Sequence, residues 1–497
     1  MSWRLGAVCV AVFVARIASA VVVSQPGYTD AYYFTDVAER LARGGGLSAD
    51  FVWSPIEANA FVLPVTSHLF WVPLPTVLAS IGIALLGAVL GDFRAAQAAV
   101  VLVALAIPAI TYVAARSYGV AEPFALAAAA IAGFGGAFAP GFVAVDAFAP
   151  AAVLGTGFFV AIRSAAAGSV RGGVLAGVLT GLLYLSRSEG ALFGLALLAL
   201  LGVPRARRAA IAACAVALAI GLTWLLRDLT AGAGSDVVAR SALLVRYEDF
   251  FAFHPAYLGA TDAALSDVIG VRLAALGTNA VTFAFAYVVV LIPMLVIGLR
   301  AARDRAAVRA WLGLTIVIYL VQSLIFTLHS TRGSYFHSLA ALFPFGVAIA
   351  SMGAERVLRS RPPANGLAWL WGAVVIVVAV SGAAVSQWDT TFNGGAQARL
   401  AALDAVPPGP FLAIDAAAWR WLSGRVVVVT PADGLVLAGC AAQRVGARSV
   451  VLEAAHFSRY DALYTRDERP SWLDAPLVRG TTKIYPISGT PACESAP

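Results

Sequence analysis

The residues of this chain with the clearest chemical potential are a few acids and arginines at the edges of long apolar runs. Asp30 lies just after the first apolar run, directly before the segment AYYFTDVAERLA. Asp146 lies in GFVAVDAFAP, and Arg187 and Glu189 share the short turn LSRSEG. A carboxylate can act as a general base, and an arginine can bind phosphate through charge-assisted hydrogen bonds. These residue types suit acid–base chemistry and the binding of an anionic group.

Each of these residues also has a purely structural interpretation. Asp30 stands where a helix cap belongs, and a capping carboxylate accepts hydrogen bonds from unpaired backbone amides. Asp146 could be stabilised by the positive end of a helix dipole. Arg187 and Glu189 could form a local ion pair that satisfies the turn. Arg332, in HSTRGSYFH, lies at the mouth of another apolar run and could bind phosphate as well as Arg187 could.

The composition predicts that a membrane protein positions these residues. The chain is 60% hydrophobic and 12% charged, with a mean hydropathy of +0.84, whereas soluble domains average about 25% charged residues. The net charge of +7 does not indicate nucleic acid as a partner, because the basic residues lie in short loops between apolar runs. The first run ends in ASA like a secretory signal, but Arg16 interrupts it and many apolar runs follow, so we expect an uncleaved first span.

Apolar runs predict about eleven transmembrane helices, since a span needs about 20 apolar residues. The expected spans are roughly 5–23, 96–115, 120–139, 147–162, 171–186, 189–203, 209–226, 275–299, 309–328, 336–353 and 366–385. Arginine-rich loops between spans should face the cytoplasm. This orientation places on the outer side the loop 24–70, Asp146, the turn 187–189, the loop 329–337 and everything after residue 387. We therefore expect a multi-pass protein of the inner (plasma) membrane.

The apolar segment 71–91 is long enough to span as well, but a full crossing would reverse every later loop. We therefore expect a re-entrant or interfacial helix on the outer face, with Pro73 and Pro75 bending its entry. Whether this segment spans the membrane or lies at the interface stays open.

The composition changes after the last expected span. The runs PGPFLAID, AAAWRWLSG, RVVVVTP, ADGLVLAGCAAQRVG and ARSVVLE predict strand, helix, strand, helix and strand, which is a small α/β domain. Cys440 and Cys493 lie in this domain and could pair if it is extracytoplasmic. The predicted organisation is a helical transmembrane domain at residues 1–386, with a first outer loop at 24–91, and an extracytoplasmic α/β domain at 387–497.

The polar loop after the first span contains an expected amphipathic helix. The segment that follows Asp30 places apolar residues on one stripe and offers two i,i+4 ion pairs, Asp36–Arg40 and Glu39–Arg43. Such a helix is suited to lying on a membrane surface. The run GGG just after it should stop the helix.

The pattern GYTDAYYFTDVAERLARGGGL, followed by Trp53, PVTSH and WVPLP, resembles the first outer loop of the GT-C integral-membrane glycosyltransferases. This superfamily includes protein O-mannosyltransferases, aminoarabinose transferases, arabinofuranosyltransferases and oligosaccharyltransferases. The segment PGFVAVD is similar to the family's second outer acid, and YLSRSEG to its L-x-R-x-[DE]-G turn. The resemblance covers about residues 1–390 and implies a GT-C-like helical fold.

The resemblance also implies an activity. Such enzymes move a sugar from a polyprenyl-phosphate carrier to a glycan, lipid or protein acceptor at the outer membrane face, usually with inversion. Asp30 would be the general base, because a partly desolvated carboxylate is more basic. Asp146 would be an auxiliary acid, and Arg187 and Arg332 would bind the lipid phosphate. Further residues are expected to face the donor and acceptor: Tyr33, Glu57, His68, Glu189 and His337.

No cofactor is certain, although a divalent metal could be bound, as in some family members. His68, His254 and His337 with Glu57 could gather one, but their spacing matches no recognised ligand motif, and interfacial hydrogen bonding is the alternative. Nucleotide-binding motifs are missing from suitable contexts, which favours a lipid-linked donor.

Two other function classes stay open. A transporter or flippase would have inverted repeats and charges near mid-bilayer, whereas the sequence shows no repeat and its acids lie at span ends. A non-catalytic subunit of a cell-envelope glycan assembly would have no need of Asp30. The sugar, the acceptor and the oligomeric state are not predicted.

Overall fold

The structure is a computed structural model with two compact units. It describes residues 3–57, 62–231, 241–253, 263–302, 305–358, 363–491 and 493. The first unit comprises Met1–Ser24, Trp71–Thr230 and Arg272–Asp389. The second unit comprises Gln25–Phe70, Ala231–Val271 and Thr390–Pro497. Residues 25–70 therefore group with the C-terminal residues, which the sequence did not indicate.

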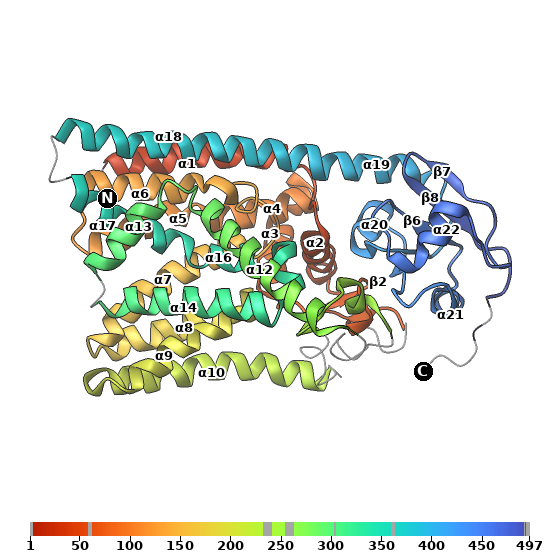
Figure 1. Cartoon of the computed structure of the whole chain (residues 1–497), viewed down its shortest axis with the longest axis horizontal. Helices are drawn as coiled ribbons and strands as arrows, with labels where there is room; N and C mark the ends of the chain where they lie inside the picture. Colours follow the sequence, from red (N-terminus) through yellow and green to blue (C-terminus); the bar gives the residue numbers. More distant parts are fainter. Residues whose placement is uncertain are drawn as a thin grey trace. The chain divides into compact units, whose positions relative to one another are not determined.

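The first unit is helical. Its principal helices, including one that begins in the second unit, are α1 (Trp3–Val22), α3 (Leu74–Leu90), α4 (Asp92–Ala104), α5 (Ala106–Ser117), α6 (Glu122–Phe134), α7 (Phe148–Ala166), α8 (Val170–Ser186), α9 (Gly194–Leu201), α10 (Arg207–Thr230), α12 (Leu265–Ala286), α13 (Ile292–Ala301), α14 (Ala306–Leu324), α15 (Thr327–His329), α16 (Tyr335–Ala340), α17 (Phe343–Leu358) and α18 (Pro363–Trp388). Figure 1 shows α1, α6 and α18 lying side by side.

Small residues bring helices α8 and α10 close together. Gly173 and Gly177 are one helical turn apart on α8, and they face Ala209 and Ala213 of α10. A Cβ atom at Gly173 would clash with the Ala209 carbonyl oxygen. Helices in a membrane associate through such close packing, because lipid provides no hydrophobic force between them.

Fewer helices have full span length than the sequence predicted. Among the described residues, seven helices are long and apolar enough to cross a membrane, and the bent pair Thr327–Ala340 and Phe343–Val357 would make an eighth. Three expected spans, 120–139, 171–186 and 189–203, instead contain apolar helices of only 10–17 residues. The expected span 275–299 is divided between α12 and α13.

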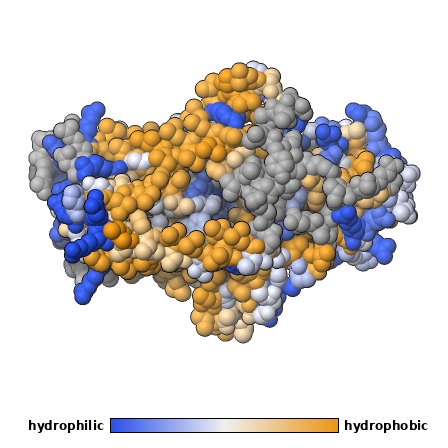
Figure 2. Space-filling view, turned by 90° about the horizontal axis from the view of Figure 1, so that it is seen from below, coloured by the Kyte–Doolittle hydropathy of each residue, from blue (hydrophilic) through white to orange (hydrophobic). Residues whose placement is uncertain are grey.

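The helix in segment 71–91 is confirmed as α3, which has 17 residues and is shorter than the roughly 20 that a span needs. Large hydrophobic side chains are exposed on several helices of the first unit, as expected for surfaces that face lipid. On the face shown in Figure 2, hydrophobic residues form a broad orange area, with hydrophilic residues gathered at its left end.

The second unit is built on a six-stranded sheet in the order β2-β5-β4-β6-β8-β7. Its strands are β2 (Phe51–Val52), β4 (Phe411–Ala413), β5 (Val427–Val429), β6 (Ser449–Leu452), β7 (Leu477–Arg479) and β8 (Thr482–Pro486). The first four spatial neighbours are parallel, and β8 is antiparallel to both β6 and β7. Strands β4, β5 and β6 are completely buried, which explains their continuous apolar runs.

The five predicted C-terminal elements are confirmed, with helices α20 (Ala416–Ser423) and α21 (Leu435–Val445) between the three strands. The first outer loop adds β2 to the edge of this sheet, next to β5. The same loop forms a short antiparallel pair, β1 (Ser48–Ala49) and β3 (Val65–Thr66), and helix α2 (Thr29–Ala42), which packs against α20.

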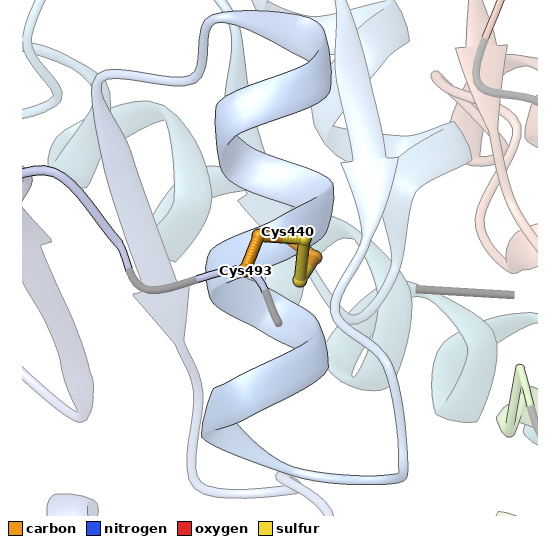
Figure 3. The surroundings of a disulfide bond; sticks show 2 residues. All are labelled: Cys440 and Cys493. Atoms are coloured by element: carbon orange, nitrogen blue, oxygen red, sulfur yellow. A yellow bond between two sulfur atoms is a disulfide. The ribbon is translucent and has the colours of Figure 1, made fainter. Parts of the chain in front are cut away.

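A disulfide joins Cys440 of α21 to Cys493, so the pairing that the sequence left open is present (Figure 3). It closes a sequence separation of 53 residues and attaches the last described residue to the helix. The remaining cysteines, Cys9 and Cys214, are free.

Candidate functional site

Asp30 lies in the first turn of α2, and the N-cap position belongs to Tyr28. Asp30 is therefore not the N-cap residue of α2, and its structural interpretation as a cap is wrong. A carboxylate in the first turn is nevertheless stabilised by the positive end of the helix dipole. Asp30 is half-buried, so its carboxylate is partly withdrawn from water.

The surroundings of α2 differ from those of a helix lying on a membrane. Residues 31–38 are all buried, so protein encloses the helix on more than one side. The predicted Glu39–Arg43 pair is present, at 3.9 Å. Asp36 instead forms an ion pair with Arg420 of α20 at 3.6 Å, and Arg40 pairs with Asp50 at 2.5 Å. These pairs fasten α2 within the second unit.

Three residues predicted to face the donor and acceptor, Tyr33, Glu57 and His68, lie together inside the second unit. The Tyr33 hydroxyl donates to the Glu57 carboxylate, at 3.0 Å from each oxygen, and accepts from the His68 backbone N–H at 2.5 Å. The backbone N–H groups of Leu69 and Phe70 donate to Glu57 Oε1 at 3.2 and 3.3 Å. All three predicted side chains are buried, so they fix the shape of the loop.

In this cluster, Glu57 has a shifted pKa and His68 has an uncommon backbone conformation. Burial raises the pKa of Glu57 to about 7, although the hydrogen bonds from Tyr33 and from the two backbone N–H groups act in the opposite direction. The Tyr33 ring makes edge contacts with the rings of Phe51, Trp53 and His68. His68 has a φ of 63°, a left-handed conformation that is uncommon outside glycine.

Asp146 and His337, which the sequence predicted separately, form a pair in the first unit. His337 Nε2 lies 2.8 Å from Asp146 Oδ2. Asp146 is completely buried in the turn before α7, and its other carboxylate oxygen accepts from the Ala147 N–H. The His337 ring stacks on Phe148, with 4.0 Å between ring centroids.

The hydrogen bonds of His337 define how a proton is held in this pair. His337 Nδ1 lies 2.9 Å from the Gly333 carbonyl oxygen. A carbonyl can only accept, so this network assigns a proton to Nδ1. Nε2 then either donates to an ionised Asp146 or accepts from a protonated Asp146. The two arrangements differ only in which group carries one shared proton.

Arg187 and Glu189 form the ion pair that the structural interpretation expected, at 2.9 Å and with side chains only 16% and 12% exposed. The pair belongs to a wider network. Glu189 Oε1 also accepts from Gln322 Nε2 at 2.6 Å, Ser334 Oγ at 3.0 Å and Ser338 Oγ at 3.1 Å. The turn is therefore fastened to α14 and to the chain around α16. These three polar partners were not predicted from the sequence, although Gln322 is a polar residue within a mostly apolar expected span.

Arg332 is exposed and lies in the π-helical segment Ser330–Ser334. Gly333 breaks the helix there, with a φ of 117°. Arg187 Nη2 donates to Ser334 Oγ at 3.0 Å, and Gly333 is the carbonyl partner of His337. The kinked segment that carries Arg332 is therefore bonded to both the Arg187 turn and the Asp146–His337 pair.

Arg94 and Gln97 of α4 bind the end of α1, which the sequence did not indicate. Arg94 Nη1 donates to the carbonyl oxygens of Ala20 and Val23, at 2.5 and 3.1 Å. Gln97 Nε2 donates to the same Val23 oxygen at 2.9 Å. The last carbonyls of a helix lack intrahelical partners, so a cation there is stabilising.

Arg16 is also structural. Its guanidinium donates to the carbonyl oxygens of Gly133 and Ala139, at the end of α6 and beyond, and lies 4.8 Å from the centre of the Phe142 ring. Of the residues considered as metal ligands, His254 lies outside the described residues. The divalent metal stays a prediction.

No protein-family model matches the sequence, and no curated protein resembles it significantly in sequence. The fold, in contrast, is similar to solved structures. One is the archaeal oligosaccharyltransferase AglB from Archaeoglobus fulgidus in complex with an inhibitory peptide and a dolichol-phosphate. Its TM-score is 0.59 at 13% identity, over 90% of this chain and 69% of AglB. Another is ArnT from Cupriavidus metallidurans bound to undecaprenyl phosphate, with a TM-score of 0.57 at 15% identity, over 98% of this chain and 99% of ArnT.

At these identities the likeness establishes a shared fold. The predicted fold class, a polytopic helical membrane protein with a small C-terminal α/β part, is confirmed.

Proposed function

We propose that this protein is a membrane glycosyltransferase that moves a sugar from a polyprenyl-phosphate donor to an acceptor at the outer face of the membrane. The observation that carries the proposal is the fold shared with two proteins whose solved structures hold a polyprenyl phosphate. One of them, AglB, is an oligosaccharyltransferase. The first-loop pattern around Asp30 supports the same activity.

The chemistry needs mainly one base. As the acceptor oxygen bonds to the sugar's anomeric carbon, the bond from that carbon to the phosphate oxygen breaks and phosphate leaves with the electron pair. The proton of the acceptor hydroxyl passes to the base, which we assign to Asp30. The half-buried position of Asp30 supports this role, because the carboxylate lies at the surface and is only partly withdrawn from water. Direct displacement of this kind inverts the anomeric centre.

The remaining candidate residues receive auxiliary roles. Asp146, paired with His337, would be the auxiliary acid, since the pair can hold or release one proton. Arg187 and Arg332 would bind the lipid phosphate, whose negative charge grows as the sugar leaves. Arg332 is the more exposed of the two.

An outer location for the C-terminal α/β domain is part of the proposal. The Cys440–Cys493 disulfide supports it, because disulfides persist in oxidising compartments outside the cytoplasm. A donor with a lipid anchor and an acceptor at the outer face would then meet in that compartment.

The test is sugar transfer in membranes that contain the wild type or Asp30→Asn, supplied with a panel of isotopically labelled polyprenyl-phosphate sugars. We expect transfer by the wild type and a loss of about 100-fold or more in Asp30→Asn, as for removal of a general base. The matched control is Asp404→Asn, an exposed acid of the same unit, which should transfer like the wild type.

Two results would contradict the proposal in different ways. Equal transfer by Asp30→Asn and wild type would remove Asp30 as the base and direct attention to Asp146. If the wild type consumes no donor from a broad panel, a transporter or flippase, or a non-catalytic assembly subunit, becomes the better description.

A further inference from the structure

The start of α2 is held by residues that follow it by more than 350 positions in the same unit. Residues 25–32 contact the segment 392–421 at four points. These are the hydrogen bonds Gln25–Asn393, at 3.2 Å, and Thr29–Asp415, at 3.1 Å, and the ring contacts Tyr28–Phe392 and Tyr32–Trp421, each with 5.6 Å between centroids. We call Phe392, Asn393, Asp415 and Trp421 the α2 clamp.

The clamp residues contact one side of the first turn of α2, and Asp30 lies on the other side. An α-helix turns by about 100° per residue, so Thr29 and Tyr32 share one face, and Tyr28 is the N-cap residue directly before them. Asp30 lies about 130° around the helix from the centre of that face. The clamp therefore fixes the rotation of the first turn without covering the carboxylate of Asp30.

Asp415 is the polar centre of the clamp, and an ion cluster orients it. Arg399 of helix α19 (Gly394–Leu403) lies 3.1 Å from Asp415 Oδ2 through Nη1, and its Nε donates to Glu453 Oε1 at 2.9 Å. Trp419 Nε1 donates to Glu453 Oε2 at 3.1 Å. Each carboxylate oxygen of Asp415 thus has its own partner, Thr29 for Oδ1 and Arg399 for Oδ2.

The position of this cluster in the sheet is informative. Asp415 follows β4 and Glu453 follows β6, so both lie at the carboxyl ends of neighbouring parallel strands. The chain runs from β4 to β5 on one side and then returns past β4 to β6 on the other. In open α/β sheets such a switch point is where ligands bind. Here the ion cluster and Thr29 occupy it.

We propose that Asp415, oriented by Arg399 and Glu453, is a positioning residue that sets the direction of the Asp30 carboxylate through Thr29. The C-terminal sheet then acts as a brace for the first turn of α2. The consequence for catalysis rests on the proposed function, since it requires Asp30 to be the base. The clamp itself does not depend on that function.

The first arm of the test measures transfer kinetics of the full-length protein with Thr29→Val and Thr29→Ser. Valine removes the hydroxyl at nearly constant volume, and serine retains it. We expect Thr29→Val to lower kcat about 10-fold with the donor KM unchanged, because a small misplacement of a catalytic group slows the chemical step. Thr29→Ser should retain the wild-type kcat. Thr465→Val, an exposed threonine of the same unit, is the matched control.

The second arm needs no activity. Hydrogen exchange is measured at the backbone amides of residues 32–36, the first of which donates to the Tyr28 carbonyl at 3.0 Å. We expect faster exchange in Thr29→Val, and also in Asp415→Asn, because the amide of this variant cannot form the ion pair with Arg399. Thr29→Ser should exchange like the wild type. Unchanged exchange in both altered variants would overturn the clamp.

The two arms separate the two proposals. If the wild type transfers no sugar, the proposed function fails while exchange still decides the clamp. If exchange becomes faster but kcat does not fall, the clamp holds the helix without affecting catalysis. The proposal that Asp415 positions Asp30 is then overturned.

Discussion

His337 Nε2 lies 2.8 Å from Asp146 Oδ2, although 191 residues separate the two in sequence. Asp146 is completely buried and His337 is nearly so. A buried carboxylate is costly unless it is paired, and the shared proton described above satisfies both groups. The two residues should therefore hold and release a proton together.

Because the two residues share one proton, their substitutions should have non-additive effects on sugar transfer. Asp146→Asn and His337→Asn should each lower sugar transfer, by about 100-fold if the pair handles a proton in the reaction. The double variant should be no slower than the slower single variant, because either change already removes the shared proton. Initial rates for the four proteins, measured with one donor, test this. Multiplying losses in the double variant would mean that the two residues act independently.

Glu57 predicts a pH-dependent contribution to stability. Its pKa is raised to about 7 in the folded protein from an ordinary value of 4.5. The folded state therefore binds more protons than the unfolded state between these two values, so stability due to Glu57 is present below pH 4.5 and is lost as pH rises to about 7. The slope is about 1.4 kcal/mol per pH unit in that window.

The comparison that isolates this effect is Glu57→Gln. Glutamine cannot ionise, but its oxygen can still accept from the backbone N–H groups of Leu69 and Phe70. The unfolding temperature of Glu57→Gln relative to wild type should increase between pH 5 and pH 8, measured on detergent-solubilised protein. A difference that is constant over this range would mean that Glu57 does not titrate in the folded protein near neutral pH.

The positive charge of Arg332 should affect the rate of the chemical step. In the proposed reaction the donor phosphate gains negative charge as the sugar leaves, so a guanidinium bound to it would stabilise the transition state more than the ground state. Arg332→Gln should lower kcat by about 100-fold. Arg332→Lys should lose less, because it keeps the charge but not the two-pronged geometry. The control is Arg171→Gln, an exposed arginine at the start of α8. Equal kcat in Arg332→Gln and wild type would leave Arg187 as the phosphate ligand.

Local patterns in the sequence predicted the C-terminal elements well. The runs around Val427–Val429 and Ser449–Leu452 are short, β-branched and separated by helical patterns, and both became strands. The pairing of Phe51–Val52 with β5 was beyond prediction. A strand of two residues has no measurable period, and its partner lies more than 370 positions away.

The candidate site divides in the same way. Asp30 and the Arg187–Glu189 pair were identified because they sit in recognisable local patterns. The Asp146–His337 bond and the Thr29–Asp415 bond depend on how distant segments pack, which no spacing encodes. Among the described residues, fewer helices reach full span length than the apolar runs suggested, because hydropathy measures apolar character and not helix length. Segment 171–186, for example, is apolar but forms a helix of only 17 residues.

The Cys440–Cys493 disulfide predicts both a compartment and a stability effect. If the C-terminal part lies outside the cytoplasm, these two cysteines should resist a membrane-impermeant maleimide in intact cells and react with it only after reduction. The experiment uses a chain in which Cys9 and Cys214 are serine, so that only the pair can be labelled. Labelling without reductant would contradict the bond, and no labelling after reduction would contradict the outer location.

Removing the bond should loosen the second unit. Cross-linking a loop of 53 residues is worth up to about 4 kcal/mol in the chain-entropy account, because it restricts the unfolded chain. The double variant Cys440→Ser with Cys493→Ser should therefore unfold at a lower temperature than wild type, and the wild type with reductant should match it. Since α2 is held by the same unit, exchange at its amides should also rise in the double variant. An unchanged unfolding temperature would mean that the sheet holds residues 411–452 together without help from the chain's end.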